Sequence, residues 1–283
     1  MREALPLLRD VMKRYDITPK RVLGQNFLLD ANLTDKIARV GGELSAFNVI
    51  EIGPGPGGLT RSLLNANARA VYAVEKDARC VAALEELAAA SDRLHIIEAD
   101  ALEIDLMQTV PAPRIIAANL PYNIATVLLV QWLEQIYAAP HAFARLTLMF
   151  QKEVAERIAA APNSKAYGRL SVLAQWLCES QMEFDIPPDA FVPPPKVTST
   201  VITLTPRAQP LAPAELKPLQ QVLAAAFGQR RKMLRVALKT LQVDAEQLLQ
   251  AAGIDATRRG ETLDIHEFCR LAQCYARMKN TRE

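Results

Sequence analysis

The stretch that decides the fold is Asn48-Val-Ile-Glu-Ile-Gly-Pro-Gly-Pro-Gly-Gly58, a short apolar run that leads into four glycines. The run from Asn48 to Ile52 is rich in β-branched residues and predicts a buried strand. Residues 59–66 then have a helix-forming composition. Glycines between a strand and a helix let the backbone approach a ligand, and the helix start presents free N–H groups. The stretch therefore predicts a ligand-binding loop.

The glycine loop alone does not choose its ligand. Gly53, Gly55 and Gly58 satisfy the G-x-G-x-x-G pattern of dinucleotide-binding proteins, and Glu75 follows Gly53 by 22 residues, where a ribose-binding acid is expected. A dehydrogenase that binds NAD has the same features. The choice of cofactor must come from residues further along the chain.

Strand and helix alternate along most of the chain. Further buried strands are predicted at residues 70–75, 94–99, 114–118 and 145–150, and helices at 77–90, 124–137, 151–161 and 170–178. Asp77 can cap its helix through a side-chain oxygen. Strands that alternate with helices imply a parallel, doubly wound sheet.

The pattern changes in the last third of the chain. Two strands, Met182 to Ile186 and Thr198 to Leu204, follow each other without room for a crossover helix, so we expect an antiparallel hairpin. A parallel sheet that ends in such an edge hairpin is more typical of methyltransferases than of dehydrogenases. From residue 215 to 278 the pattern is wholly helical, and Asp264 with Glu267 three residues later predicts a cap for the last helix.

These patterns together predict the architecture. We expect an α/β fold with a Rossmann-like methyltransferase sheet, an antiparallel edge hairpin and a small all-α C-terminal domain. The loop 207–213 contains two prolines and marks the expected boundary. Residues 1–206 would form the catalytic domain and residues 207–283 the helical one.

Composition excludes several classes of protein. Half of the 283 residues are hydrophobic and 23% are charged, which is ordinary for a globular protein. No apolar run reaches the ~18–20 residues that span a bilayer, and the first residues carry charges where a signal peptide is apolar. We therefore expect a soluble, cytoplasmic protein. The four cysteines and three histidines are scattered, which favours neither a disulfide framework nor a metal site.

The basic residues gather towards the C-terminus. Residues 207–283 contain 13 Lys and Arg against 8 Asp and Glu, a net charge of +5, whereas the rest of the chain has a net charge of −3. The stretch from Gly228 to Lys239 holds five basic residues and no acid, which suits a polyanionic partner. We expect a helix there, with Arg231, Arg235 and Lys239 along one face. A merely solvated helix face is the alternative.

Polar residues that can choose the cofactor follow the third and fourth predicted strands. Asp100 and then Asn119 stand where an open α/β sheet binds its ligands, at the carboxyl ends of its strands. A carboxylate at Asp100 can accept the exocyclic amine of an adenine, while Glu75 takes the ribose hydroxyls. A helix cap or a solvated loop residue is the alternative reading of Asp100.

The tetrapeptide Asn119-Leu-Pro-Tyr122 is more specific. It is similar to the Asn/Asp-Pro-Pro-Tyr tetrad of methyltransferases that modify an exocyclic amino nitrogen, with Leu120 in place of the first proline. Such a nitrogen is a poor nucleophile, because its lone pair is delocalised into the base. The Asn119 side-chain oxygen and the Leu120 carbonyl can accept its two N–H bonds, Pro121 stiffens the loop, and Tyr122 stacks on the base. An ordinary strand-to-helix turn is the alternative.

The chain resembles the ribosomal RNA adenine N6,N6-dimethyltransferase family over almost its whole length, and it resembles the small-subunit (16S) members of that family most. The other matching segments are Gly24-Gln-Asn-Phe-Leu28, Gln151-Lys-Glu-Val154, Tyr167-Gly-Arg-Leu-Ser171, Phe191-Val-Pro-Pro-Pro-Lys-Val197 and Phe227-Gly-Gln-Arg-Arg-Lys232. The resemblance implies S-adenosylmethionine as cofactor and the transfer of two methyl groups to each of two adjacent adenosines. It also implies 16S rRNA in an immature small subunit as partner, a role in ribosome biogenesis, and a monomer.

The resemblance also implies roles for individual residues. Asn26 and Leu28 would lie at the methionine side of the cofactor, with Gly53 and Gly55 beneath it. Glu75 would hold the ribose, Asp100 and Ala101 the adenine, and Asn119 both cofactor and target amine. Phe191 would face Tyr122 across the target adenine, since aromatic rings stack well on bases; a buried loop anchor is the alternative. The RNA-binding residues would be Arg230, Arg231, Lys232 and Arg235.

Three other functions stay open at the level of sequence. An NAD-dependent dehydrogenase would share the glycine loop and Glu75, but would leave Asn119-Leu-Pro-Tyr122 without a task. An enzyme that modifies large-subunit RNA in macrolide resistance shares the catalytic motifs and differs in the segments 167–171 and 191–195. A third possibility is an RNA-binding assembly factor whose methylation is secondary, since both roles use the same basic surface.

Overall fold

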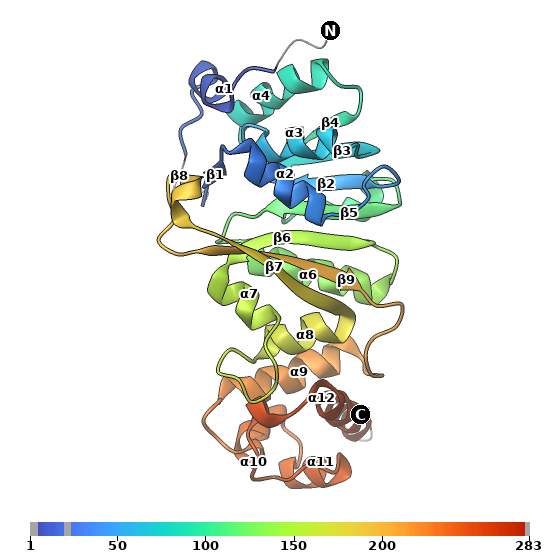
Figure 1. Ribbon diagram of the computed structural model, residues 1–283. Helices are drawn as coiled ribbons and strands as arrows, with labels where there is room; N and C mark the ends of the chain where they lie inside the picture. Colours follow the sequence, from blue (N-terminus) through green and yellow to red (C-terminus); the bar gives the residue numbers. More distant parts are fainter. Residues whose placement is uncertain (1–4, 20–23, 281–283) are drawn as a thin grey trace. The chain divides into compact units, whose positions relative to one another are not determined.

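Within the described residues, 5–19 and 24–280, seven strands of the computed structural model form one sheet (Figure 1). Their order across the sheet is β4-β3-β2-β5-β6-β9-β7. The strands are β2 (Asn48–Ile52), β3 (Ala70–Glu75), β4 (Leu94–Glu98), β5 (Arg114–Asn119), β6 (Arg145–Gln151), β7 (Cys178–Ile186) and β9 (Ser199–Pro206). A two-stranded sheet pairs β1 (Phe27–Leu28) antiparallel with β8 (Phe191–Val192).

The large sheet is parallel except at one edge. β2 pairs in parallel with β3 on one side and with β5 on the other, and the parallel pairing continues to β4 and to β6. β9 runs antiparallel to β6, and β7 lies beside β9 at the edge. The predicted Rossmann-like sheet with an edge hairpin is therefore confirmed. The order of the strands in the sheet changes direction between β2 and β5, because β3 and β4 lie on one side of β2 and the later strands lie on the other. An open α/β sheet binds its ligand at such a point.

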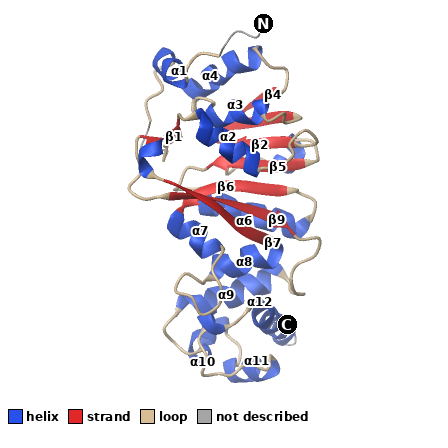
Figure 2. Ribbon diagram, in the orientation of Figure 1, coloured by secondary structure: helices blue, strands red, loops and turns tan. Residues whose placement is uncertain are grey.

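Helices connect the strands and fill the C-terminal part. They are α1 (Leu8–Arg14), α2 (Ala31–Val40), α3 (Gly58–Asn65), α4 (Ala78–Ala89), α5 (Leu106–Thr109), α6 (Ala125–Ala138), α7 (Lys152–Ile158), α8 (Arg169–Leu177), α9 (Leu216–Gly228), α10 (Leu234–Ala237), α11 (Ala245–Ala251) and α12 (Ile265–Asn280). Short 3-10 turns are η2 (Pro188–Ala190), η3 (Leu238–Leu241) and η4 (Gly260–Thr262). Beyond Pro206, the described residues form only helices and connecting loops (Figure 2).

Two predicted helix caps are confirmed. The Asp77 carboxylate accepts a hydrogen bond from Arg79 N at 3.2 Å and begins α4. At the start of α12, Asp264 accepts from Glu267 N at 2.8 Å, and Glu267 accepts from Asp264 N at 2.9 Å. Each pair satisfies backbone donors that a helix start leaves without intrahelical partners.

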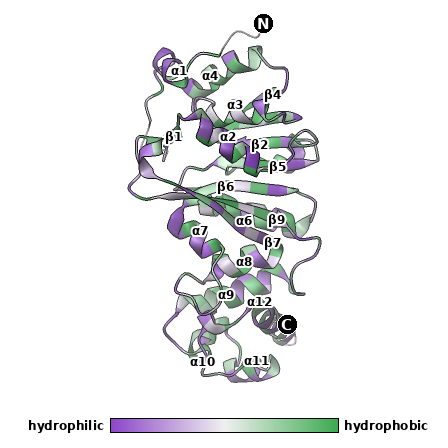
Figure 3. Cartoon of the chain, viewed as in Figure 1, coloured by the Kyte–Doolittle hydropathy of each residue, from purple (hydrophilic) through white to green (hydrophobic). Residues whose placement is uncertain are grey.

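The core fixes the ends of the strands. Every residue of β2 is buried, and β5 and β6 carry mostly hydrophobic residues (Figure 3). Strands that are buried on both faces have continuous apolar runs in their sequence, and the sequence therefore predicted these strands. Because the core sets the register of parallel neighbours, the loops that follow β2, β3, β4 and β5 all lie along one edge of the sheet.

The chain divides into two compact units. The first contains the described residues up to Trp132, with 141–155 and 181–206, and the second contains 133–140, 156–180 and the described residues from Arg207 onwards. One boundary between the units lies at Pro206, and α8 belongs to the second, mostly helical unit. Trp176 of α8 is fully buried, and its indole N–H donates to the Ala212 carbonyl at 2.7 Å. The assignment of catalysis to one unit and RNA binding to the other stays a prediction.

The basic stretch from Gly228 to Lys239 is not the continuous helix that we expected. α9 ends at Gly228, residues 229–233 turn, and α10 covers only Leu234–Ala237. Backbone pairing with a distant segment breaks the helix, since Leu234 N donates to the Arg258 carbonyl at 2.7 Å. The predicted single stripe of Arg231, Arg235 and Lys239 is therefore wrong, although all three residues are exposed.

Candidate functional site

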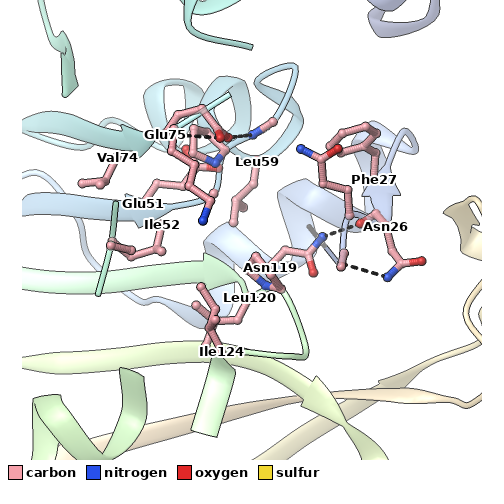
Figure 4. Close-up of a pocket in the computed structure, with 18 of the residues that line it drawn as sticks. Asn26, Phe27, Glu51, Ile52, Leu59, Val74, Glu75, Asn119, Leu120 and Ile124 are labelled. Carbon is pink, nitrogen blue, oxygen red and sulfur yellow. Dashed lines mark hydrogen bonds between the residues drawn. The ribbon is translucent and has the colours of Figure 1, made fainter. Parts of the chain in front are cut away.

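A pocket opens at the carboxyl ends of the parallel strands in the first compact unit (Figure 4). Its walls come from the segment 24–28, the glycine loop after β2, and the residues that follow β3, β4 and β5. All eight predicted cofactor-binding residues line it: Asn26, Leu28, Gly53, Gly55, Glu75, Asp100, Ala101 and Asn119. The topology therefore brings together residues that are up to 93 positions apart in sequence.

The glycine loop is built from backbone that side chains rarely adopt. Gly53, Gly55 and Gly57 have φ angles of +65°, +56° and +91°. A Cβ at Gly55 would lie 2.6 Å from Cε1 of Phe27, a distance that no side chain tolerates. The Phe27 ring therefore packs directly on the loop backbone and forms one wall of the pocket. This close approach explains why glycine stands at position 55.

Glu75 holds the glycine loop in place. Its carboxylate accepts hydrogen bonds from Gly55 N at 3.1 Å, Lys76 N at 2.8 Å and Asp77 N at 2.9 Å. Burial raises the pKa of Glu75, and the three backbone N–H groups oppose the rise. A carboxylate offers about four acceptor positions, so capacity remains for a ligand hydroxyl. Glu75 thus combines a pocket position with a structural role that the sequence did not indicate.

Asp100 stands in the turn that follows β4. One carboxylate oxygen accepts from Leu102 N at 2.9 Å, and the other pairs with Lys76 Nζ at 3.1 Å. Both contacts lower the pKa of Asp100, the backbone contact most. No helix begins at Asp100, so the helix cap that we considered as an alternative is wrong; the side chain instead closes a turn, and it lines the pocket as well. Lys76, to which we assigned no role, also lines it.

The Asn119 side chain is oriented by hydrogen bonds at the end of β5. Its Nδ2 donates to the Asn26 carbonyl at 3.0 Å, and Asn26 Nδ2 donates to the Gly24 carbonyl at 3.2 Å (Figure 4). This arrangement uses the donor side of the Asn119 amide. Among the described residues no donor is bonded to Asn119 Oδ1, so the acceptor remains for another partner.

The other residues of the tetrapeptide 119–122 differ in exposure. Leu120 is buried and lines the pocket with Pro121. Pro121 lies against Gly53, where a Cβ would come within 3.6 Å of the proline ring. Tyr122 is partly buried outside the pocket lining, and its hydroxyl shares a hydrogen bond of 2.6 Å with Ser199 Oγ. Burial raises the pKa of Tyr122, and Ser199 opposes the rise.

Phe191 lies in the hydrophobic core and not at the pocket. It is 1% exposed, pairs with Leu28 in the small sheet, and packs in the same cluster as Met149 and Val201. The loop-anchor alternative describes this position. Stacking on a target base requires the ring to leave this cluster, so its role as a wall opposite Tyr122 stays a prediction.

Sequence reasoning gave no role to Glu51, the last-but-one residue of β2. Its side chain lines the pocket and is 2% exposed, and its Oε2 has no hydrogen-bond partner in the described part of the chain. Burial raises the pKa of Glu51 to about 8, the Glu75 carboxylate adds to the rise, and Thr60 opposes it. The signal was present in the sequence as an acid inside an apolar strand that ends at the ligand loop.

The raised pKa of Glu51 predicts a pH-dependent stability. In the folded chain this carboxyl holds its proton up to about pH 8, whereas in the unfolded chain it loses the proton near pH 4.5. The stability that it contributes is therefore lost as the pH rises from about 4.5 to about 8. In Glu51→Gln this loss is absent. We measure the free energy of unfolding in urea and subtract the value of the native chain from that of the variant. This difference should be larger at pH 9 than at pH 5 by roughly 1 kcal/mol or more. An equal difference in unfolding free energy at both pH values would contradict the assignment.

Comparison with known proteins identifies the family of the chain that carries this pocket. The model of a family described as ribosomal RNA adenine dimethylase matches residues 18–277. The chain belongs to this family. It is therefore a methyltransferase that uses S-adenosylmethionine, as the tetrapeptide 119–122 predicted, and not an NAD-dependent dehydrogenase.

Curated relatives agree with the family. Ribosomal RNA small subunit methyltransferase A of Rhodospirillum rubrum is 56% identical over 272 residues, which cover 96% of this chain and 93% of that protein. The protein of the same name from Xanthobacter autotrophicus is 54% identical over 281 residues, which cover 98% and 96%.

Solved structures share the fold of the family. The 23S rRNA methyltransferase ErmE matches with a TM-score of 0.64 and 27% identity, covering 89% of this chain and all of ErmE. A dimethyladenosine transferase from Plasmodium falciparum matches with a TM-score of 0.76 and 24% identity, covering 88% and 97%. None of the helices in the described ranges of this chain combines the length and the apolar character that crossing a membrane requires.

The residues at the pocket fit S-adenosylmethionine. The left-handed glycines at residues 53 and 55 line the pocket with backbone atoms alone, and they pack against Pro121 and Phe27. Carboxylates at the ends of β3 and β4 offer acceptors for ribose hydroxyls and for an adenine amine, and both line the same pocket. The contacts of Glu75 and Asp100 with the cofactor stay a prediction.

Proposed function

We propose that the chain transfers methyl groups from S-adenosylmethionine to the N6 amines of two adjacent adenosines in small-subunit rRNA, two groups to each. Its partner is 16S rRNA in an immature small subunit, it acts as a monomer, and it works in the cytoplasm, where subunits are assembled. The names of relatives that are more than 50% identical over nearly the whole chain support the small-subunit substrate.

The observation that carries the chemistry is the orientation of Asn119. Its amide nitrogen is occupied by the Asn26 carbonyl, so its Oδ1 is presented as an acceptor. An adenine N6 amine donates one N–H to that oxygen and the other to the Leu120 carbonyl. These two bonds direct the nitrogen lone pair at the methyl donor, which is a contribution of orientation and electrostatics. The methylated amine is acidic enough to lose its proton to these acceptors or to water.

The cofactor would be held by the residues that line the rest of the pocket. S-adenosylmethionine supplies an electrophilic methyl group on a sulfonium. Glu75 accepts from the ribose hydroxyls through the position that its backbone partners leave, and Asp100 with Ala101 contacts the adenine. Asn26, Leu28 and the loop at Gly53 and Gly55 enclose the methionine side. The support for this assignment is their common location around one pocket.

RNA binding is assigned to the exposed basic residues of the turn and short helix after α9. Arg231, Lys232 and Arg235 are exposed to solvent. Arg230 differs, because its guanidinium donates to the Tyr167 carbonyl at 2.8 Å and pairs with Glu261 at 2.9 Å. We therefore assign phosphate contacts to Arg231, Lys232 and Arg235, and a structural role to Arg230.

The basic turn can be tested through salt dependence. Each phosphate contact releases counterions, so the loss of a contact makes log affinity depend less steeply on log salt concentration. The double variant Arg231→Gln with Arg235→Gln should reduce the magnitude of this slope by about 1.4–1.8. Fluorescence anisotropy with a labelled rRNA fragment measures the slope. Lys217→Gln with Arg270→Gln is the matched control, because it removes two exposed charges elsewhere in the second unit. A slope equal to that of the native chain, at unchanged melting temperature, would place the RNA contacts elsewhere.

The substrate assignment is tested with purified particles. Small and large ribosomal subunits that lack adenine methylation are incubated separately with the protein and radiolabelled S-adenosylmethionine. We expect close to four labelled methyl groups per small subunit and none on the large subunit. Methylation of the large subunit alone would favour the macrolide-resistance type of activity.

A further inference from the structure

We propose that Ser199 is a positioning residue that holds the Tyr122 ring in the orientation needed to stack on the target adenine. The inference rests on the proposed function, which assigns base stacking to Tyr122. It adds a residue from β9, at the antiparallel edge of the sheet, to a site that is otherwise built at the carboxyl ends of the parallel strands.

The contact between the two residues is short and sheltered. The hydroxyl of Tyr122 and Oγ of Ser199 lie 2.6 Å apart and share a hydrogen bond across 77 residues of sequence. Ser199 is fully buried, whereas Tyr122 is only partly buried. The hydroxyl end of the tyrosine is therefore attached to the protein interior, while part of the residue remains open to a ligand.

Ser199 is a fixed point because the residues on both sides of it are tied down. The Thr198 carbonyl accepts from Lys152 N at 2.9 Å, at the start of α7. Thr200 Oγ1 donates to Asp185 on β7 at 2.6 Å, and that carboxylate also pairs with Lys152 Nζ at 2.6 Å. Ser199 itself stands opposite Gln151 in the pairing of β9 with β6. The sheet edge and α7 together hold its hydroxyl in place.

The tether matters because a tyrosine ring can turn about two side-chain bonds. Without a partner at the hydroxyl, the ring samples orientations that do not lie parallel to the base. The target nitrogen must reach the methyl donor with its lone pair aligned, and small errors in placement reduce rate strongly. The hydrogen bond thus contributes pre-organisation of the ring, whereas the ring itself supplies the stacking surface.

A double-mutant cycle tests the proposal. Ser199→Ala and Tyr122→Phe each remove the hydrogen bond and keep the ring. We expect each to lower kcat on undermethylated small subunits by about 3- to 10-fold, the worth of one hydrogen bond. KM for the subunit and affinity for S-adenosylmethionine, measured by titration calorimetry, should change less than about twofold. The double variant should be no slower than either single variant.

The control is Thr203→Val, which removes another buried hydroxyl from β9. Thr203 Oγ1 has no hydrogen-bond partner among the residues that the structure describes, and the variant should keep native kcat. Melting temperatures of all variants check the fold. If Ser199→Ala fails to fold, Tyr122→Phe still decides the question, because it leaves β9 unchanged.

The outcomes separate this proposal from the proposed function. If Tyr122→Ala lowers kcat strongly while Ser199→Ala and Tyr122→Phe do not, the tether is overturned and base stacking by Tyr122 stands. Fully additive losses in the double variant also overturn the tether. If Tyr122→Ala itself retains native kcat, the stacking role assigned under the proposed function fails, and the tether fails with it.

Discussion

Replacing Asn119 by alanine is expected to lower methyl transfer to small-subunit RNA by about 10²–10³-fold, the usual effect of removing one pre-organised polar contact to a reacting group. We expect this loss because the variant lacks Oδ1 of Asn119, the acceptor for the target amine. In the native chain this oxygen remains available while the amide nitrogen donates to the Asn26 carbonyl. Asn119→Ala also removes that bond, and Asn26 belongs to the cofactor wall. The rate must therefore be measured at saturating S-adenosylmethionine.

Asn123→Ala is the matched control for this experiment. Asn123 follows the tetrapeptide directly, is exposed, and does not line the pocket. It should keep native turnover, and both variants should show native circular dichroism and melting temperature. Turnover within about twofold of native for Asn119→Ala at saturating cofactor would remove Asn119 from the mechanism.

Glu75→Ala is expected to weaken S-adenosylmethionine binding by about 1–3 kcal/mol, the free energy lost when hydrogen bonds to a buried carboxylate are removed. The structure adds a second consequence. The N–H groups of Gly55, Lys76 and Asp77 lose their common acceptor, so the glycine loop loses its attachment to β3. We therefore expect a lower free energy of unfolding as well as a raised Kd in titration calorimetry.

Two further variants separate these consequences. Glu75→Gln keeps one side-chain oxygen for the backbone donors, so it should recover stability more than cofactor affinity. Glu98→Ala is the control outside the pocket, since Glu98 is the exposed residue opposite Glu75 in the pairing of β3 with β4. Native cofactor affinity in Glu75→Ala would show that the carboxylate does not contact the cofactor.

The sequence predicted the elements that build the pocket because their signals are local. β2 and β5 are continuous apolar runs, and the glycines at 53, 55 and 57 adopt the left-handed backbone that only glycine adopts easily. Glu75 and Asn119 stand at strand ends, where topology alone brings polar residues together. The caps at Asp77 and Asp264 are equally local and were confirmed.

Features that depend on distant contacts were not predictable in this way. The helix after α9 breaks because Leu234 bonds to Arg258 and because the Arg230 guanidinium binds carbonyl oxygens near residue 165. Phe191 is buried because β8 pairs with β1, two strands of two residues each. Helix propensity and aromatic character say nothing of such partners. The membership of α8 in the helical unit has the same origin, the burial of Trp176.

The central claim is that this chain dimethylates two adjacent adenosines of small-subunit rRNA. Mass spectrometry of nuclease digests of that RNA, from a strain that lacks the gene, tests it most directly. We expect the deletion to remove N6,N6-dimethyladenosine from one fragment with two adjacent adenosines. The native gene should restore all four methyl groups, and the gene with Asn119→Ala should not. Full dimethylation of that fragment in the deletion strain would contradict the account.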